Sequence, residues 1–160
     1  MSLFAASVPP ALQALERGRG LLDLATPVLL AAQLAPRMLN TAGQLRTVAS
    51  FALRATYPLT GQSAPSIAFY ESGSDLRACF QKTTRLILAL DPTSFSAETV
   101  THRAGFADLT QTGADYLNHF ALPNLWFHLS MAYATLRASG VPLGKADFDG
   151  LHSYPTGFSF

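Results

Sequence analysis

The feature that most constrains the fold of this chain is a series of stretches in which apolar residues recur at helical spacing. Each stretch ends at a break that contains a proline. Each stretch repeats apolar residues three and four positions apart, which predicts a helix with one buried face. The breaks fall at residues 26–27, 57–58, 91–92 and 140–142, and each contains a proline. A residue before proline is disfavoured in helical geometry, and glycine is common just beyond a helix end. The long helices are therefore predicted at residues 7–24, 36–57, 72–91 and 112–139, with a short helical turn at 28–34.

The starts of these helices carry signals of their own. The first helix has Ser7 as an N-cap with Pro9 and Pro10 in its first turn, and the second has Pro36. The third has Ser72 or Ser74 as an N-cap, and the fourth has the pair Thr112 and Asp115. Small polar residues satisfy the free amide groups at a helix start, and proline costs nothing in the first turn. Four helices with short or moderate connections predict an all-α four-helix bundle.

Residues 93–111, between the third and fourth long helices, lack helical periodicity. Residues 99–103 alternate in polarity, Gly105 allows a turn, and residues 106–109 can form the returning strand. This pattern predicts a small β-hairpin. Within the loop before the third helix, the apolar patch at residues 67–70 is expected to pack against the bundle.

We expect residues 1–160 to form one domain, because this length suits a single core. Its C-terminal tail, residues 145–160, is too rich in apolar side chains to remain free. These are Phe148, Leu151, Tyr154, Phe158 and Phe160. We expect the tail to pack on the bundle or on a neighbouring chain.

The composition of the chain favours self-association. Charged residues make up 13% and apolar residues 49%, whereas charged residues average about a quarter in soluble proteins. Large exposed apolar patches usually mark interfaces, so we expect a homodimer. The net charge of +1 and the scattered Lys and Arg residues do not suit a nucleic-acid surface.

Other sequence features indicate a cytoplasmic protein. The N-terminus lacks the basic segment of a signal peptide, and no apolar run approaches the roughly 20 residues of a membrane span. Cys79 is the single cysteine, so an internal disulfide is excluded, and its helical context predicts a buried thiol.

Several blocks together resemble the DUF1993 family of domains of unknown function. They are MSLFAASVP at residues 1–9, APRM at 35–38, YLNHFALPNLWFH at 116–128 and GVPLGK at 140–145. That family is similar in fold to the DinB/YfiT-like proteins, which are up-down-down-up four-helix bundles and commonly dimers. Many of those proteins hold a divalent metal with three histidines, and some are thiol-dependent transferases. The resemblance implies the fold and supplies no reaction.

The three-histidine pattern takes one ligand from the second long helix and two, four residues apart, from a later helix. Residues 36–57 contain no His, Asp, Glu or Cys. On the fourth helix His119 and His128 are nine residues apart, which is half a turn out of phase at 100° per residue. The residue four before His128 is Asn124, a poor ligand. We therefore expect no metal and no cofactor.

Asn124 and His128 share one face of the fourth helix with Phe120 and Met131. In one interpretation they are structural, and they bond each other or a facing helix, because buried polar groups are normally paired. In the other interpretation they form the polar floor of an apolar pocket whose walls include Trp126, Phe127 and Tyr133. The candidate ligand-binding residues are Asn124, Trp126, His128 and Tyr133, and the candidate catalytic residues are His119 and His128.

Pro123 and the remaining histidines also allow two interpretations. Pro123 either bends the fourth helix around its neighbours or frees the carbonyl of His119 for a ligand. Asp115, four residues before His119, could orient the imidazole or simply favour the helix dipole. His102 and His152 are expected in solvated loops.

We therefore expect a metal-free, non-catalytic homodimer with a binding or structural role. One alternative is a metal- or thiol-dependent transferase or hydrolase of the DinB-like type. Another is a small-molecule binding module with a pocket near Pro123.

Overall fold

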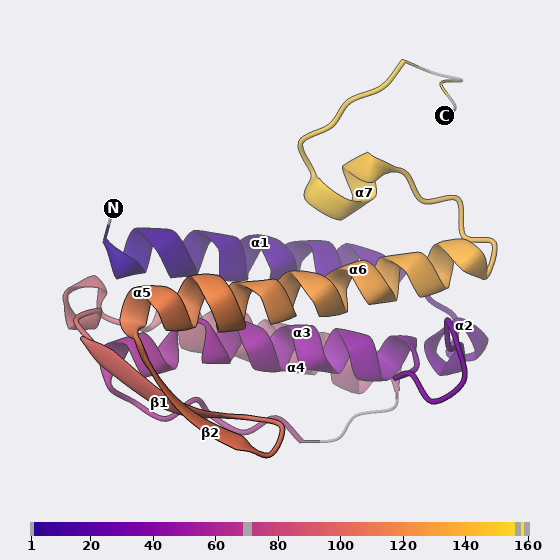
Figure 1. Ribbon diagram of the computed structural model, residues 1–160. Helices are drawn as coiled ribbons and strands as arrows, with labels where there is room; N and C mark the ends of the chain where they lie inside the picture. Colours follow the sequence, from indigo (N-terminus) through magenta and orange to yellow (C-terminus); the bar gives the residue numbers. More distant parts are fainter. Residues whose placement is uncertain (1, 69–71, 156–157, 159–160) are drawn as a thin grey trace.

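The computed structural model describes residues 2–68, 72–155 and 158. Its long helices are α1 (Leu3–Asp23), α3 (Thr41–Arg54), α4 (Gly73–Leu88) and α6 (Leu122–Ala138). α1 and α6 run in one direction and α3 and α4 in the other, which gives the up-down-down-up arrangement (Figure 1). α1 and α3 each pack against both α4 and α6. The predicted four-helix bundle is confirmed.

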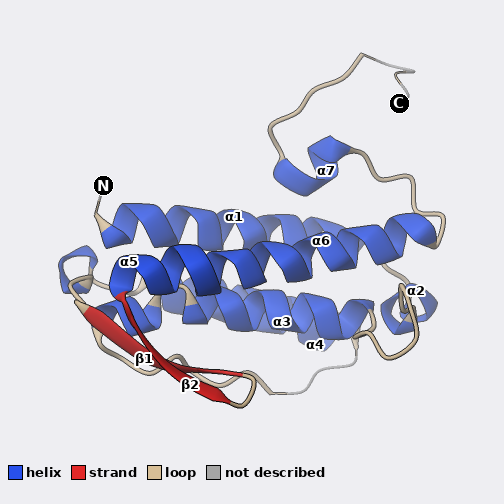
Figure 2. Ribbon diagram, in the orientation of Figure 1, coloured by secondary structure: helices blue, strands red, loops and turns tan. Residues whose placement is uncertain are grey.

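The predicted hairpin between the third and fourth long helices is also confirmed (Figure 2). Strand β1 (Thr99–Ala104) pairs antiparallel with β2 (Ala107–Thr112), and Thr99 faces Thr112. Gly105 at the tip has φ of 60°, a left-handed conformation that glycine adopts without steric cost. The short helices are α2 (Pro27–Ala31), η1 (Tyr57–Thr60), η2 (Pro92–Ser94), α5 (Gly113–Asp115) and α7 (Lys145–Asp149), and a π-helix, η3 (Tyr116–Ala121), precedes α6.

The predicted start of the first helix at Ser7 is wrong. α1 begins at Leu3, and the side chain of Ser2 accepts a hydrogen bond from the Ala5 amide at 3.2 Å. Ser7 is buried inside the helix, where its hydroxyl donates to the Leu3 carbonyl at 2.7 Å. Pro9 therefore lies within α1. In a regular helix an amide at position 9 would donate to the Ala5 carbonyl, and proline has no such amide. Both Pro9 and Ala5 are on the exposed side of the helix. That carbonyl can bond water instead, so the helix continues.

The predicted start of the second long helix at Pro36 is wrong as well. α3 begins at Thr41, because Asn40 is the N-cap and its side chain accepts from the Gly43 amide at 2.8 Å. Arg37 has φ of 65°, which interrupts any helix that starts at Pro36. Of the alternatives for α4, Ser72 is the N-cap.

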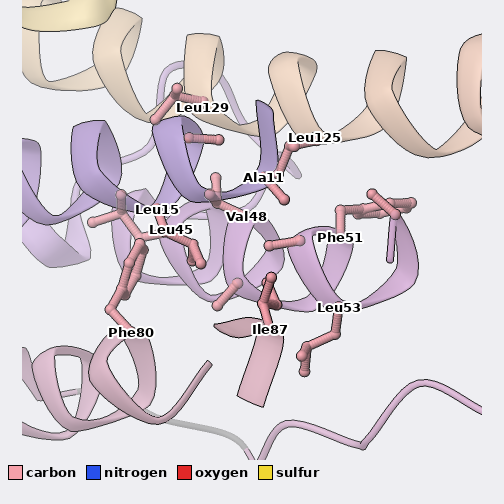
Figure 3. Close-up of a cluster of buried hydrophobic side chains, with 14 of the residues drawn as sticks. Ala11, Leu15, Leu45, Val48, Phe51, Leu53, Phe80, Ile87, Leu125 and Leu129 are labelled. Carbon is pink, nitrogen blue, oxygen red and sulfur yellow. The ribbon is translucent and has the colours of Figure 1, made fainter. Parts of the chain in front are cut away.

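The core joins side chains from the long helices (Figure 3). Close helix contact depends on residues without bulk, including Ala11, Ala14, Ala49 and Ala52, all fully buried. At Gly18 a Cβ atom would lie 2.7 Å from the Phe80 ring, so α1 and α4 approach closely only because this residue is glycine. Cys79 is buried as predicted, and burial raises the pKa of its thiol.

Part of the predicted tail packs on the bundle. α7 contacts α1, where Gln13 donates to the Asp149 carbonyl at 3.0 Å. Beyond Gly150 the chain leads away from the helices (Figure 1), and Leu151 is 79% exposed. Phe160 lies outside the described residues, as do Phe69 and Tyr70 of the apolar patch, whereas Ile67 packs against the core. In the part of the chain that is described, no helix has the length and apolarity of a membrane span.

Candidate functional site

The fourth long helix begins irregularly at the candidate site. Thr112 is its N-cap, as predicted, and accepts from the Asp115 amide at 3.1 Å. Three α-helical residues then give way to the π-helix η3. The Leu122 amide donates to the Leu117 carbonyl, five residues back. Pro123 follows directly and has no amide proton for a helical bond. Such π segments often occur at functional sites.

Asn124 forms a side-chain hydrogen bond with this irregular segment. Its amide nitrogen Nδ2 donates to the Phe120 carbonyl at 2.7 Å. The predicted alternative in which Asn124 bonds His128 is therefore not the arrangement found, because Asn124 turns back onto the π-helix. This contact supports the structural interpretation of Asn124.

His128 instead bonds the facing helix, as the other predicted alternative has it. Its Nδ1 atom lies 2.8 Å from Oε1 of Gln44 on α3, and Gln44 is buried. Nε2 of Gln44 donates to the Leu39 carbonyl at 3.4 Å, which orients Oε1 toward the imidazole. An amide oxygen only accepts, so Nδ1 of His128 carries the proton and donates it.

Burial lowers the pKa of the His128 imidazole from its ordinary value of 6.5. The neutral ring thus holds its proton on Nδ1 and a lone pair on Nε2. Within the described residues Nε2 has no hydrogen-bond partner, and it is not among the fully buried nitrogen atoms. His128 therefore presents a hydrogen-bond acceptor of fixed tautomer.

The structure does not bring all of the candidate ligand-binding residues together. Trp126 and Tyr133 face α7, with ring centroids 6.3 and 5.9 Å from that of Phe148. Tyr133 lines a small hollow of about 230 Å³ with Ser130, Lys145 and Phe148. Asn124 and His128 contact other partners, so the four residues do not form one pocket.

His119, the other candidate catalytic residue, lies apart from His128. Its Nδ1 atom is 3.6 Å from Asp115, and the two side chains are 71% and 52% exposed. Two exposed groups at that distance interact weakly. The nine-residue spacing predicted that the two histidines lie on opposite sides of the helix. In the structure His119 is solvated and His128 is half-buried.

The prediction that His102 lies in a solvated loop is wrong. It is on β1, half-buried, and its ring centroid is 4.2 Å from that of Phe120 and 4.8 Å from that of Tyr116. Its Nε2 atom lies 2.7 Å from Oε1 of Gln111. The signal was present in the sequence, because the two-residue period of a strand puts His102 on the same face as the apolar Val100. His152, in contrast, is exposed and pairs with Asp149.

A row of aromatic rings connects the two half-buried histidines. Phe51 stacks on His128 at 5.6 Å and contacts Phe120 at 5.7 Å, and Phe120 in turn contacts His102. The guanidinium of Arg54 lies 4.7 Å from the Phe51 ring centroid and 5.0 Å from that of Phe120. The rings therefore pack against both imidazoles.

The residues do not fit a three-histidine metal centre. α3 and α6 meet at Gln44 and His128, and the residue four before His128 is Asn124. Both amide groups are engaged by hydrogen bonds, and only one imidazole is present. Over residues 2–68 and 72–155, no three His, Cys, Asp or Glu side chains gather closely enough to hold a metal ion.

The comparisons with known proteins agree with this fold. The solved structure of a DinB family member protein from Shewanella denitrificans superimposes with a TM-score of 0.83 and 24% sequence identity, over 96% of this chain and 95% of that one. A search of curated proteins gives no match. The sequence model of the DUF1993 family, a domain of unknown function, matches residues 3–149. Since that match spans nearly the whole chain, this protein belongs to the DUF1993 family and has the fold of the DinB proteins.

Proposed function

We propose that this protein is a homodimeric binding protein that works without a three-histidine metal centre. The observation that supports this most strongly is the contact between His128 and Gln44 at 2.8 Å. The group of α3 that meets His128 is an amide and not an imidazole, and the contact uses one of the two ring nitrogens of His128. The remaining nitrogen, Nε2, is the group offered to a hydrogen-bond donor on a small molecule.

Elemental analysis of protein purified without a histidine tag tests the metal-free assignment. We expect Zn, Ni, Fe and Mn far below one ion per chain. The matched variants are His128→Ala at the site and His119→Ala on the exposed face of the same helix. A stoichiometric metal that disappears in His128→Ala and persists in His119→Ala overturns the proposal.

The same two variants test His128 as a ligand-binding group. We expect compounds that raise the melting temperature of the wild type to lose this effect in His128→Ala and to keep it in His119→Ala. Equal shifts in both variants would show that such compounds bind elsewhere and would refute the role of His128.

The groove between α1 and α4 supports the second part of the proposal, the homodimer. It has a volume of about 470 Å³, with Leu15 and Phe80 buried at its base and Leu12 and Leu88 offering the accessible apolar surface. Leu88 is 65% exposed. Glu16, Arg19 and Arg85 lie around the same groove, so a twofold axis can set the carboxylate of one copy against a guanidinium of the other. This self-complementary charge favours a second copy of the chain as the occupant.

Light scattering coupled to size exclusion tests the dimer at micromolar concentration. We expect a dimer for the wild type and a monomer for Leu88→Glu, because a charge in the groove opposes burial. The control is Val28→Glu, since Val28 is 81% exposed on α2, outside the groove. A monomeric wild type, or equal effects of the two variants, contradicts this interface.

A further inference from the structure

A second pocket lies between the hairpin and the C-terminal end of α3. It is an open hollow with a volume of about 330 Å³. Arg54 and Tyr116 line it from the long helices, Thr99–His102 from β1, Pro58 from η1, and residues 61–64 from the loop after η1. None of these residues belongs to the α3–α6 contact of Gln44 and His128, so this pocket is separate from the site of the proposed function.

Arg54 is the charged group of this pocket. Its guanidinium lies over the Phe51 and Phe120 rings, and Nη2 donates to the Arg103 carbonyl at 2.9 Å. A guanidinium has five N–H donors in one plane. No carboxylate in the described chain forms an ion pair with Arg54, and no Asp or Glu is among the described lining residues. The rings hold the cation in place, and its hydrogen bonds with the Arg103 carbonyl and the Tyr116 hydroxyl leave further N–H groups for a ligand.

Tyr116 and His102 close the pocket beside this cation. The Tyr116 hydroxyl donates to the Arg54 carbonyl at 2.7 Å, which fixes the backbone at the end of α3. Burial raises the pKa of Tyr116 to about 12, so the phenol stays neutral and adds no negative charge. Nδ1 of His102 is buried and has no hydrogen-bond partner in the described chain.

The rest of the lining divides between apolar and hydroxyl groups. Pro58, Ala64 and Val100 offer apolar surface, whereas Ser63 and Thr99 carry hydroxyls and the Thr101 hydroxyl pairs with that of Thr110 at 3.0 Å. With about 330 Å³ of space around a single cation, the pocket suits a compact small molecule. One guanidinium balances one negative charge, and its planar edge matches the two oxygens of a carboxylate.

We propose that this pocket binds a small monocarboxylate, with the carboxylate on Arg54 and the carbon skeleton between Val100, Pro58 and the Tyr116 ring. The site goes beyond the proposed function, and neither assignment requires the other. The geometry points to a ligand with one charged end and a compact body of the size of benzoate.

Titration of the full chain with benzoate, followed by NMR of the backbone amides, tests this proposal. Benzamide is the neutral probe of the same shape, and inorganic phosphate tests a second class of anion. We expect benzoate to shift the amides of residues 61–64 and 99–102, with a dissociation constant in the millimolar range for a ligand of about nine non-hydrogen atoms. Benzamide and phosphate should each bind at least tenfold more weakly.

Two variants and one matched control complete the experiment. Arg54→Met keeps apolar contact with the phenyl rings and removes the charge, and it should weaken benzoate binding at least tenfold. Ser63→Tyr changes an exposed loop position in the pocket lining and obstructs the pocket, so it should also abolish binding, and it carries the test if Arg54→Met does not fold. Arg103→Gln removes a neighbouring charge that does not line the pocket, and it should change the affinity less than twofold.

Three results overturn the proposal. The first is an equal loss of affinity in Arg103→Gln and Arg54→Met, which would show unspecific attraction of anions. The second is equal binding of benzoate and benzamide, or tighter binding of phosphate. The third is a set of amide shifts away from the pocket, or unchanged binding in Ser63→Tyr.

Discussion

Nδ1 of His128 on α6 lies 2.8 Å from Oε1 of Gln44 on α3, and this hydrogen bond joins residues 84 positions apart across the bundle. Gln44 is nearly inaccessible to solvent, at 2% exposure, so its amide oxygen has little access to water as an alternative donor. The bond therefore bears on both the stability of the α3–α6 contact and the chemistry of the imidazole.

Removing the amide of Gln44 should destabilise the bundle. We expect Gln44→Met to lower the free energy of unfolding by about 1–3 kcal/mol, because the Nδ1–H group of His128 loses its partner. A urea-unfolding cycle of Gln44→Met, His128→Phe and the double variant should give a coupling of about 0.5–1.5 kcal/mol. Additive effects of the two substitutions would contradict the bond.

The low pKa of His128 should make stability depend on pH. Its pKa in the folded chain is below the ordinary 6.5, so near and below pH 6.5 the unfolded chain binds more protons than the folded one. Stability contributed by the neutral ring is complete above pH 6.5 and decreases as the pH falls toward the folded-state pKa. Urea unfolding between pH 8 and pH 5 should show this loss, and His128→Gln should lose less over the same range. An identical pH dependence in that variant would refute the assignment.

A three-histidine site should be recoverable at the α3–α6 contact. The double variant Gln44→His with Asn124→His supplies the two missing imidazoles beside His128. We expect it to bind Zn²⁺ or Ni²⁺ about tenfold or more tighter than the wild type in calorimetric titration. The control combines Gln44→His with Asn118→His, because Asn118 is exposed. Equal metal affinity in the two double variants would show that Asn124 does not face the site.

Asn124 should matter for the helix rather than for the imidazole. Asn124→Ala removes the hydrogen bond from Nδ2 to the Phe120 carbonyl, and we expect a loss of about 0.5–1.5 kcal/mol in unfolding free energy. Asn118→Ala, on the exposed side of the same segment, should change it by less than about 0.5 kcal/mol. An NMR titration should give the same pKa for His128 in both variants. A shifted pKa in Asn124→Ala alone would instead link Asn124 to the site.

Two glycines of α1 provide a matched pair for the close contact with α4. A Cβ at Gly18 would lie 2.7 Å from the buried Phe80 ring, whereas a Cβ at Gly20 meets nothing within 4 Å. We expect Gly18→Ala to destabilise the chain by about 1–3 kcal/mol through overpacking. Gly20→Ala should stabilise it by up to about 1 kcal/mol, because alanine favours the helix. Thermal unfolding compares the two variants, and a neutral Gly18→Ala would mean that the ring can move.

Local sequence signals predicted most of the fold. The breaks at Pro58, Pro92 and Pro142 fall where the long helices have ended, and the alternation after residue 98 predicted the hairpin. The errors occurred where two local signals competed. Asn40 caps α3 in place of Pro36, and Ser2 caps α1 in place of Ser7, because a side chain that satisfies a free amide decides a helix start more strongly than a nearby proline.

The candidate site was predictable only in part. The spacing of His119 and His128 predicted opposite faces, and one is solvated while the other is half-buried. Neither Gln44 nor His102 was recognised as part of the site. Gln44 has no sequence feature that distinguishes it from a surface glutamine, and the strand period that could have revealed His102 spans only a few residues.

The sequence by itself determined which residue types could take part. It excluded a histidine ligand from residues 36–57, and it set the positions of Pro123, Asn124 and His128 on one helix. Only the tertiary structure decided the partners: Gln44 for His128, the π-helix carbonyl of Phe120 for Asn124, and an aromatic wall for His102. The physical reason is that helical and strand periods specify which face a side chain occupies. The residue it meets across an interface depends on how the helices and the hairpin pack together.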